Sequence, residues 1–190
     1  MIGIKSIASY VPAEGVDNYA QGASFGKDED FILGKIGSTF LPRKADGQET
    51  SDLCVEAANK LFASNPQLKR EEVDVLIVVT QNGDEEGLPH TAAIVQDKLG
   101  LSTNVAAFDI SLGCSGYAYG IYAIKGFMEA AGLKNGLLIT ADPTRRLPTL
   151  KTATPPCCSV TRPPPPGWVR ALRGNWARRS SVRTVPVRRT

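Results

Sequence analysis

The sequence has few of the residues that bind metals or form disulfides. Its 190 residues include one histidine and four cysteines, with no C-x-x-C spacing. Zinc sites and disulfide frameworks need such spacings, so we expect neither a bound metal nor stabilising disulfides. The chain also lacks a run of ~18 apolar residues and a long apolar stretch after Met1, which argues against a membrane span or signal peptide. These absences favour a cytoplasmic protein.

Acidic residues are missing from the last quarter of the chain. All 19 Asp and Glu residues lie at or before Asp142, together with 11 of the 22 Lys and Arg. Residues 1–143 therefore carry a formal charge of −8, whereas residues 144–190 carry +11 and hold eight of the 13 prolines. Composition alone allows a disordered basic tail that binds nucleic acid or another polyanion through counterion release. This difference in composition divides the chain into residues 1–143 and residues 144–190.

Strand-like and helix-like patterns alternate before this boundary. Apolar and β-branched runs predict strands at residues 2–11, 73–80, 105–110 and 137–141. Apolar residues at helical spacing predict helices near residues 50–65, 89–99 and 117–131. This alternation indicates an α/β fold with a mostly parallel sheet, right-handed crossovers and helices on both sides.

Cys114 stands in a glycine-flanked turn between a predicted strand and a predicted helix. Its neighbours Gly113 and Gly116 allow a tight turn that projects the thiol, and the start of the helix adds partial positive charge that favours the thiolate. The backbone N–H can face a developing oxyanion. These features are typical of a nucleophile elbow. Taken alone, a cysteine in such a turn is more often a small buried residue, so the neighbouring sequence decides.

The segment F-D-I-S-L-G-C-S-G-Y-A-Y-G at residues 108–120 resembles the active-cysteine segment of the 3-oxoacyl-[acyl-carrier-protein] synthase III family, in the thiolase superfamily. Further similarities occur in the family's order at Tyr10-Val11-Pro12, Gly37, Glu49-Thr50-Ser51, Leu88-Pro89 and Leu99-Gly100. The resemblance extends over residues 1–142. It implies the N-terminal half of a thiolase-like fold, with a mixed, mostly parallel sheet and helices on both sides.

The resemblance implies that Cys114 takes an acyl group from coenzyme A as a thioester, which condenses with malonyl-acyl carrier protein after decarboxylation. It implies acyl-CoA and an acyl carrier protein as partners, a homodimer for the full-length protein, and a role in fatty-acid or polyketide biosynthesis. No cofactor is implied beyond the coenzyme A thioester substrate. The family's His and Asn partners belong to the second half of the fold, so His90 is expected at the surface or at the start of a helix.

Three further residues match substrate-binding positions of the family. Phe31 and Lys35 match positions that stack on the adenine and approach the phosphates of coenzyme A, although Lys lacks the bidentate geometry of Arg. Leu88 matches a position, often Phe, that reaches across the dimer interface into the partner's acyl pocket, so Leu would reshape that pocket. Cys54 is expected in the core on its helix, and residues 84–86 in a solvated loop.

The sequence after Pro143 no longer resembles the family. Residues 151–162 can be back-translated with permitted codons that, read in another frame, encode D-R-N-T-A-L-L-F-G-D-A. This string resembles the family's next segment. Cys157-Cys158 must then yield Leu, and Trp168-Val169 must yield Gly. We therefore expect a frameshift at about residue 144, in the gene or in its sequencing. The resulting tail is expected to be non-native and disordered, because a Pro-rich, Arg-rich stretch with four prolines at residues 163–166 opposes a helix or a central strand.

Two other functions remain open from the sequence. A related Cys-dependent acyltransferase or hydroxymethylglutaryl-CoA-synthase-like enzyme would use the same cysteine, and residues of the missing half would discriminate between them. A non-enzymatic module with a polyanion-binding tail is less favoured, because the alternative reading frame explains the tail's composition. The sequence leaves the acyl primer and the pathway undetermined.

Overall fold

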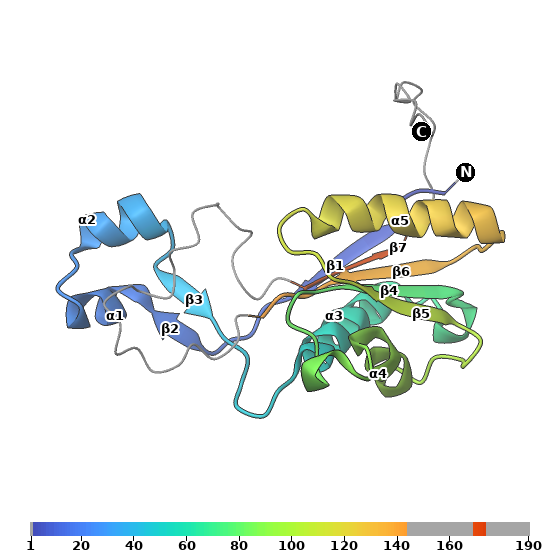
Figure 1. The fold of residues 1–190 in the computed structure, drawn as a ribbon, viewed down its shortest axis with the longest axis horizontal. Coiled ribbons are helices and arrows are strands. Elements are labelled where there is room, and N and C mark those ends of the chain that lie inside the picture. Colours follow the sequence, from blue (N-terminus) through green and yellow to red (C-terminus); the bar gives the residue numbers. More distant parts are fainter. Residues whose placement is uncertain (1, 144–168, 174–190) are drawn as a thin grey trace, which may run out of the picture.

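A computed structural model describes residues 2–143 and 169–173, with a five-stranded sheet of order β1-β7-β6-β4-β5 at its centre (Figure 1). β4 (Val75–Val79) pairs in parallel with β5 (Ala106–Ile110) and β6 (Gly136–Thr140). β7 (Val169–Arg173) runs antiparallel to both β6 and β1 (Ser6–Tyr10). Four of the five strands therefore point the same way, and their carboxyl ends share one edge of the sheet.

Helices cover both faces of this sheet. α3 (Thr50–Ser64) and α4 (Thr91–Lys98) lie on one face, and α5 (Gly116–Ala131) lies on the other (Figure 1). Both faces of β4 are buried: Leu76 packs in the cluster that includes α3 and α4, whereas Ile77 packs in the cluster that includes α5. The continuous apolar run in this strand therefore predicted its double burial correctly. No helix in the described part of the chain is long and apolar enough to cross a membrane.

The seven predicted strands and helices are all present, with ends shifted by at most four residues. The sheet lies between two helical layers, as the α/β interpretation required. β7 makes the sheet mixed, because it is the one described strand of the five that runs in the opposite direction.

Residues 12–49 form a small lobe that the sequence did not predict. The lobe lies away from the sheet, beyond the carboxyl ends of its strands (Figure 1). Its elements are the antiparallel pair β2 (Gly15–Asp17) and β3 (Phe40–Pro42), the helices α1 (Asn18–Ser24) and α2 (Glu29–Phe31), and the π-helical turn η1 (Ile32–Ile36). Two further short turns are 3-10 helices elsewhere in the chain, η2 (Arg70–Glu72) and η3 (Glu85–Gly87).

The basic tail contributes one strand to the sheet. Ala171, at the centre of β7, pairs with Ala8 of β1 and with Ile139 of β6. The expectation of a wholly disordered tail without a central strand is therefore wrong for residues 169–173. This segment contains no proline, so each residue retains a backbone N–H for the ladder. The four consecutive prolines and the rest of the tail lie outside the described residues.

Candidate active site

Cys114 lies in the turn that connects β5 to α5, and it is exposed. The N–H of Leu112 donates to the carbonyl of Ile110 at 3.0 Å, and the N–H of Gly116 donates to the carbonyl of Gly113 at 2.8 Å. These bonds close the turn on both sides of the cysteine. Cys114 thus lies in the predicted turn between a strand and a helix, and its exposed thiol is directly before a long helix.

Cys54 has the opposite environment. It is fully buried in α3, as predicted, and burial raises the pKa of its thiol. A nucleophilic cysteine needs an accessible thiol, which favours Cys114 over Cys54. Cys157 and Cys158 lie outside the described residues. Among the residues that the structure describes, no group of His, Cys, Asp and Glu side chains could hold a metal ion.

Glycines bring this turn close to the sheet. A Cβ atom built at Gly116 would lie 2.4 Å from Cγ1 of Val79, on the central strand β4. A Cβ atom at Gly113 would lie 2.5 Å from Oε1 of Gln81. Both distances are shorter than real contacts allow, but the flexible end of Gln81 can move away from Gly113, whereas the short branched side chain of Val79 cannot move away from Gly116. The start of α5 therefore rests directly on β4, where a larger residue than Gly116 would not fit. The small neighbours of Cys114 therefore serve helix packing as well as the turn.

The start of α5 provides a positive end beside the thiol. The helix has 16 residues and begins two positions after Cys114. Its N-cap residue, Ser115, makes no side-chain capping hydrogen bond. The partial positive charge at such a helix end favours negative charge nearby, including the oxyanion that develops when a thioester carbonyl is attacked.

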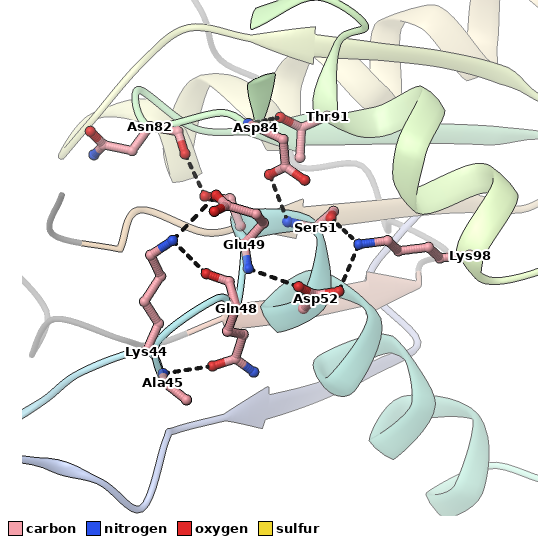
Figure 2. Close-up of polar contacts among 11 residues, drawn as sticks. Lys44, Ala45, Gln48, Glu49, Ser51, Asp52, Asn82, Asp84, Thr91 and Lys98 are labelled. Atoms are coloured by element: carbon pink, nitrogen blue, oxygen red, sulfur yellow. Dashed lines mark hydrogen bonds and ion pairs between the residues drawn. The ribbon is translucent and has the colours of Figure 1, made fainter. Parts of the chain in front are cut away.

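Hydrogen bonds attach the segment after β4 to the starts of two helices (Figure 2). Asp84 is 3% exposed, and its Oδ1 accepts from the N–H of Ser51 at 2.9 Å. The N–H of Asp84 donates to Oγ1 of Thr91 at 3.2 Å, and the Thr50 hydroxyl donates to the carbonyl of Asn82. The predicted solvated loop is therefore wrong for Asp84, because its carboxylate satisfies a free N–H at the start of α3.

Asp109 connects β5 to the start of α4. Its two carboxylate oxygens accept from the N–H groups of Thr91 and Ala92, each at 2.7 Å. His90 occupies the N-cap position of α4, and its Nε2 lies 3.1 Å from the carbonyl oxygen of Ala107. His90 is thus at the start of a helix, as predicted.

The segments that follow β4, β5 and β6 meet at the carboxyl edge of the sheet. After β6, Oδ1 of Asp142 accepts from the N–H of Gln81 at 3.3 Å and from Nδ2 of Asn82 at 2.5 Å. Cys114 follows β5, and Leu88 belongs to the loop after β4, so both are carried at this edge. Ligands of α/β sheets bind beyond the carboxyl ends of the strands.

The small lobe carries the other two predicted residues. Phe31 ends α2, and Nζ of Lys27 lies 4.9 Å from the centre of its ring. Lys35 is exposed in η1. Leu88, by contrast, is 84% exposed at the sheet edge. The structure therefore groups Cys114 with Leu88 at one edge, and Phe31 with Lys35 in the lobe.

The sequence did not reveal the roles of Asp84 and Asp109. A single carboxylate within the apolar strand at Asp109 was a usable signal, since a charged residue in a half-buried strand needs a partner. Asp84 gave no such signal. Its partner Ser51 is 33 residues away, and only the folded sheet brings the two together.

No family model matches this chain, but curated β-ketoacyl-[acyl-carrier-protein] synthase III enzymes are similar to it. The chain is 32% identical over 144 residues to β-ketoacyl-[acyl-carrier-protein] synthase III of Neisseria gonorrhoeae, a match that covers 76% of this chain and 44% of the relative. It is 35% identical over 138 residues to the synthase III of Sulfurovum sp., a match that covers 73% of this chain and 40% of the relative. The chain thus spans less than half the length of these curated relatives.

Solved structures of synthase III enzymes share the fold of this chain. A crystal structure of 3-oxoacyl-(acyl-carrier-protein) synthase III matches with a TM-score of 0.75 at 28% identity, covering 95% of this chain and 51% of that one. The synthase III of Thermus thermophilus matches with a TM-score of 0.77 at 26% identity, covering 93% of this chain and 52% of that one. At 21% identity, a protein in complex with 3-hydroxy-3-methylglutaryl coenzyme A shares the fold with a TM-score of 0.73. The chain therefore has a thiolase-like fold and is a relative of the β-ketoacyl-[acyl-carrier-protein] synthase III enzymes.

Proposed function

We propose that Cys114 is the acyl-accepting nucleophile of a condensing enzyme of the 3-oxoacyl-[acyl-carrier-protein] synthase III type. The exposed thiol at the positive end of α5, in a chain similar to these synthases, carries the proposal. Sγ bonds to the acyl carbon of an acyl-CoA, and the coenzyme A thiol leaves. Malonyl-acyl carrier protein then loses CO₂, and its carbanion attacks the thioester and releases the cysteine.

The small lobe is proposed to bind coenzyme A. The ring of Phe31 would stack on the adenine, and Lys35 would approach the phosphates. Lys27 supports this proposal, because it adds a second positive charge next to the ring. A planar ring in a lobe that also carries cationic side chains suits a ligand that combines a base with phosphates.

A homodimer in the cytoplasm is proposed for the full-length protein. Among the described strands, β5 lies at one end of the sheet, so its outer edge could pair with another chain. Leu88 is 84% exposed in the loop after β4, at the carboxyl edge of the sheet, which would allow its side chain to enter the partner's acyl pocket.

The residues after Pro143 are proposed to be read out of frame from about residue 144. The absence of acidic residues after Asp142 and the family-like string in the second frame support this proposal. The family's His and Asn would then be encoded downstream in the native frame, and the 190-residue chain would not catalyse condensation. The nucleotide sequence across codon 144 tests the proposal. A downstream His and Asn favour the synthase, whereas other residues favour the related acyltransferase or hydroxymethylglutaryl-CoA-synthase-like enzyme.

Mass spectrometry tests the role of Cys114. The chain is incubated with acetyl-CoA, and its peptides are searched for a mass increase of one acetyl group. We expect the thioester on Cys114 in the wild-type chain and in Cys54→Ala, and no thioester in Cys114→Ala. An acetyl group on another residue, with a free thiol at Cys114, would contradict the proposal.

A further inference from the structure

The loop that carries Leu88 begins at a buried carboxyl group that the proposed reaction does not use. Asp84 makes three hydrogen bonds to different segments. Its Oδ1 accepts from the N–H of Ser51 at 2.9 Å, its N–H donates to Thr91 Oγ1 at 3.2 Å, and its carbonyl accepts from the N–H of Gly87 at 2.7 Å. Because a buried polar group without partners is costly, these bonds together fix the position of Asp84.

The other end of the loop is fixed by Thr91. Its N–H donates to Oδ2 of Asp109 at 2.7 Å, while its hydroxyl accepts from the N–H of Asp84. Thr91 is completely buried. The two ends of the loop at residues 85–90 are therefore bonded directly to each other, and through Ser51 and Asp109 they are bonded to α3 and β5.

Leu88 stands at the outer part of this closed loop. Its N–H donates to the carbonyl of Glu85 at 3.3 Å, within the short turn η3 that follows Asp84. Glu85 has a φ of 45° and Gly87 a φ of 95°, so the chain reverses sharply between Asp84 and Leu88. Because the loop is this short, a displacement of Asp84 is transmitted to Leu88 within four residues.

We infer that Asp84 is a positioning residue, which sets where Leu88 lies and thereby which acyl chain lengths are accepted by Cys114 of the partner subunit in the proposed homodimer. The inference rests on the proposed function, in which Leu88 enters the acyl pocket of the partner subunit in the homodimer. Asp84 itself touches no reacting atom. It acts by joining the starts of α3 and α4 beneath the loop (Figure 2).

The test compares Asp84→Ala, Asp84→Asn and the matched control Glu85→Gln. Asn keeps an oxygen that can accept from Ser51, whereas Ala removes it, and Glu85 is exposed in the same loop. Rates of thioester formation on Cys114 are measured with acetyl-CoA and with octanoyl-CoA. We expect the ratio of the two rates to change about fivefold or more in Asp84→Ala, since small changes in an apolar pocket alter discrimination by this order. Asp84→Asn and Glu85→Gln should retain the wild-type ratio.

Hydrogen exchange of the peptide that covers residues 85–90 provides the second measurement. We expect it to exchange about tenfold faster in Asp84→Ala and at the wild-type rate in Glu85→Gln. If Asp84→Ala does not fold, Thr91→Val replaces it, because this variant removes the hydroxyl and keeps the N–H bonded to Asp109.

The outcomes separate the inference from the proposed function. An unchanged rate ratio in a folded Asp84→Ala or Thr91→Val overturns the inference while leaving the acylation of Cys114 intact. A wild-type chain that is acylated at Cys114 by neither thioester overturns the proposed function, and with it the role of Asp84 in selectivity. Unchanged exchange in both variants shows that Asp84 does not hold the loop.

Discussion

Two glycines one helical turn apart determine how α5, the helix that follows Cys114, rests on the sheet. Gly116 faces Cγ1 of Val79, and a Cβ built at Gly120 would lie 3.0 Å from Cγ2 of the same residue. Residues four apart lie on one face of a helix, so this face presents backbone to β4. The depth at which α5 packs therefore depends on both glycines, and Cys114 is carried along with the helix.

Replacing Gly116 with Ala should destabilise the protein. The new methyl group would overlap Val79, whose short branched side chain on a central strand cannot move away, and such overpacking costs about 1–3 kcal/mol. The gain in helix propensity, about 1 kcal/mol or less, offsets only part of this cost. Gly113→Ala is the control, because its neighbour is the flexible end of Gln81. Urea unfolding should show a clear decrease in the free energy of unfolding for Gly116→Ala and a much smaller decrease for Gly113→Ala. Equal decreases for the two variants would mean that the packing of α5 on β4 does not explain why a glycine is needed at position 116.

The sequence predicted the turn that carries Cys114 but not the contacts of Asp84, for a physical reason. The features of a nucleophile elbow are local, because a strand, a small-residue turn and a helix follow one another along the chain. The partners of Asp84 belong to α3 and α4, and one of them is 33 residues away. Hydrogen bonds between distant segments leave no spacing in the sequence, so the carboxyl group was interpreted as part of a solvated loop.

At the scale of elements, one carboxylate joins the start of α3 to the end of α4. Oδ2 of Asp52 accepts from the N–H of Glu49 at 2.7 Å, and Nζ of Lys98 lies 2.6 Å from Oδ1. Burial raises the pKa of the Asp52 carboxyl, but the bond from Glu49 and the contact with Lys98 outweigh it, so the pKa lies below its ordinary value of 3.8. The ionised form is therefore favoured in the folded state.

Replacing Asp52 with Asn should reduce stability at neutral pH and much less in acid. A pKa lowered by folding stabilises the protein above the unfolded value, and this contribution is lost as the pH falls through the folded value. The difference in free energy of unfolding between wild type and Asp52→Asn should thus be largest near pH 7 and shrink below about pH 4. Urea titrations at several pH values measure it. Glu56→Gln, an exposed site on the same helix, controls for the loss of one charge. A difference that does not change with pH would contradict the role of the carboxylate.

Length explains which elements the sequence predicted. α3 and α5 have 15 and 16 residues, enough for several repeats of an apolar face. β2 and β3 have three residues each, and α2 also has three. Elements this short repeat no pattern, so the lobe was not predicted, and Phe31 and Lys35 were identified only through the family resemblance.

At the scale of the whole molecule, the sheet is continuous only because β7 lies between β1 and β6. The pairing uses backbone groups, which every residue except proline offers. A five-residue segment without proline can therefore complete a sheet even where its sequence does not resemble the family's. This explains how residues 169–173 form a strand although the composition of the tail argued against one.

Replacing Ala171 with Pro tests whether β7 holds the sheet together. Ala171 pairs with strands on both sides, and proline removes its N–H and disfavours a central strand, so we expect a loss of about 2 kcal/mol or more. Ala171→Gly keeps the N–H and should lose only about 1 kcal/mol. Urea unfolding of the 190-residue chain measures both. If Ala171→Pro is as stable as wild type, the tail does not pair with β1 and β6, and the disorder expected from its composition extends to residues 169–173. A large loss shows instead that a segment proposed to be out of frame stabilises the half-domain that carries Cys114.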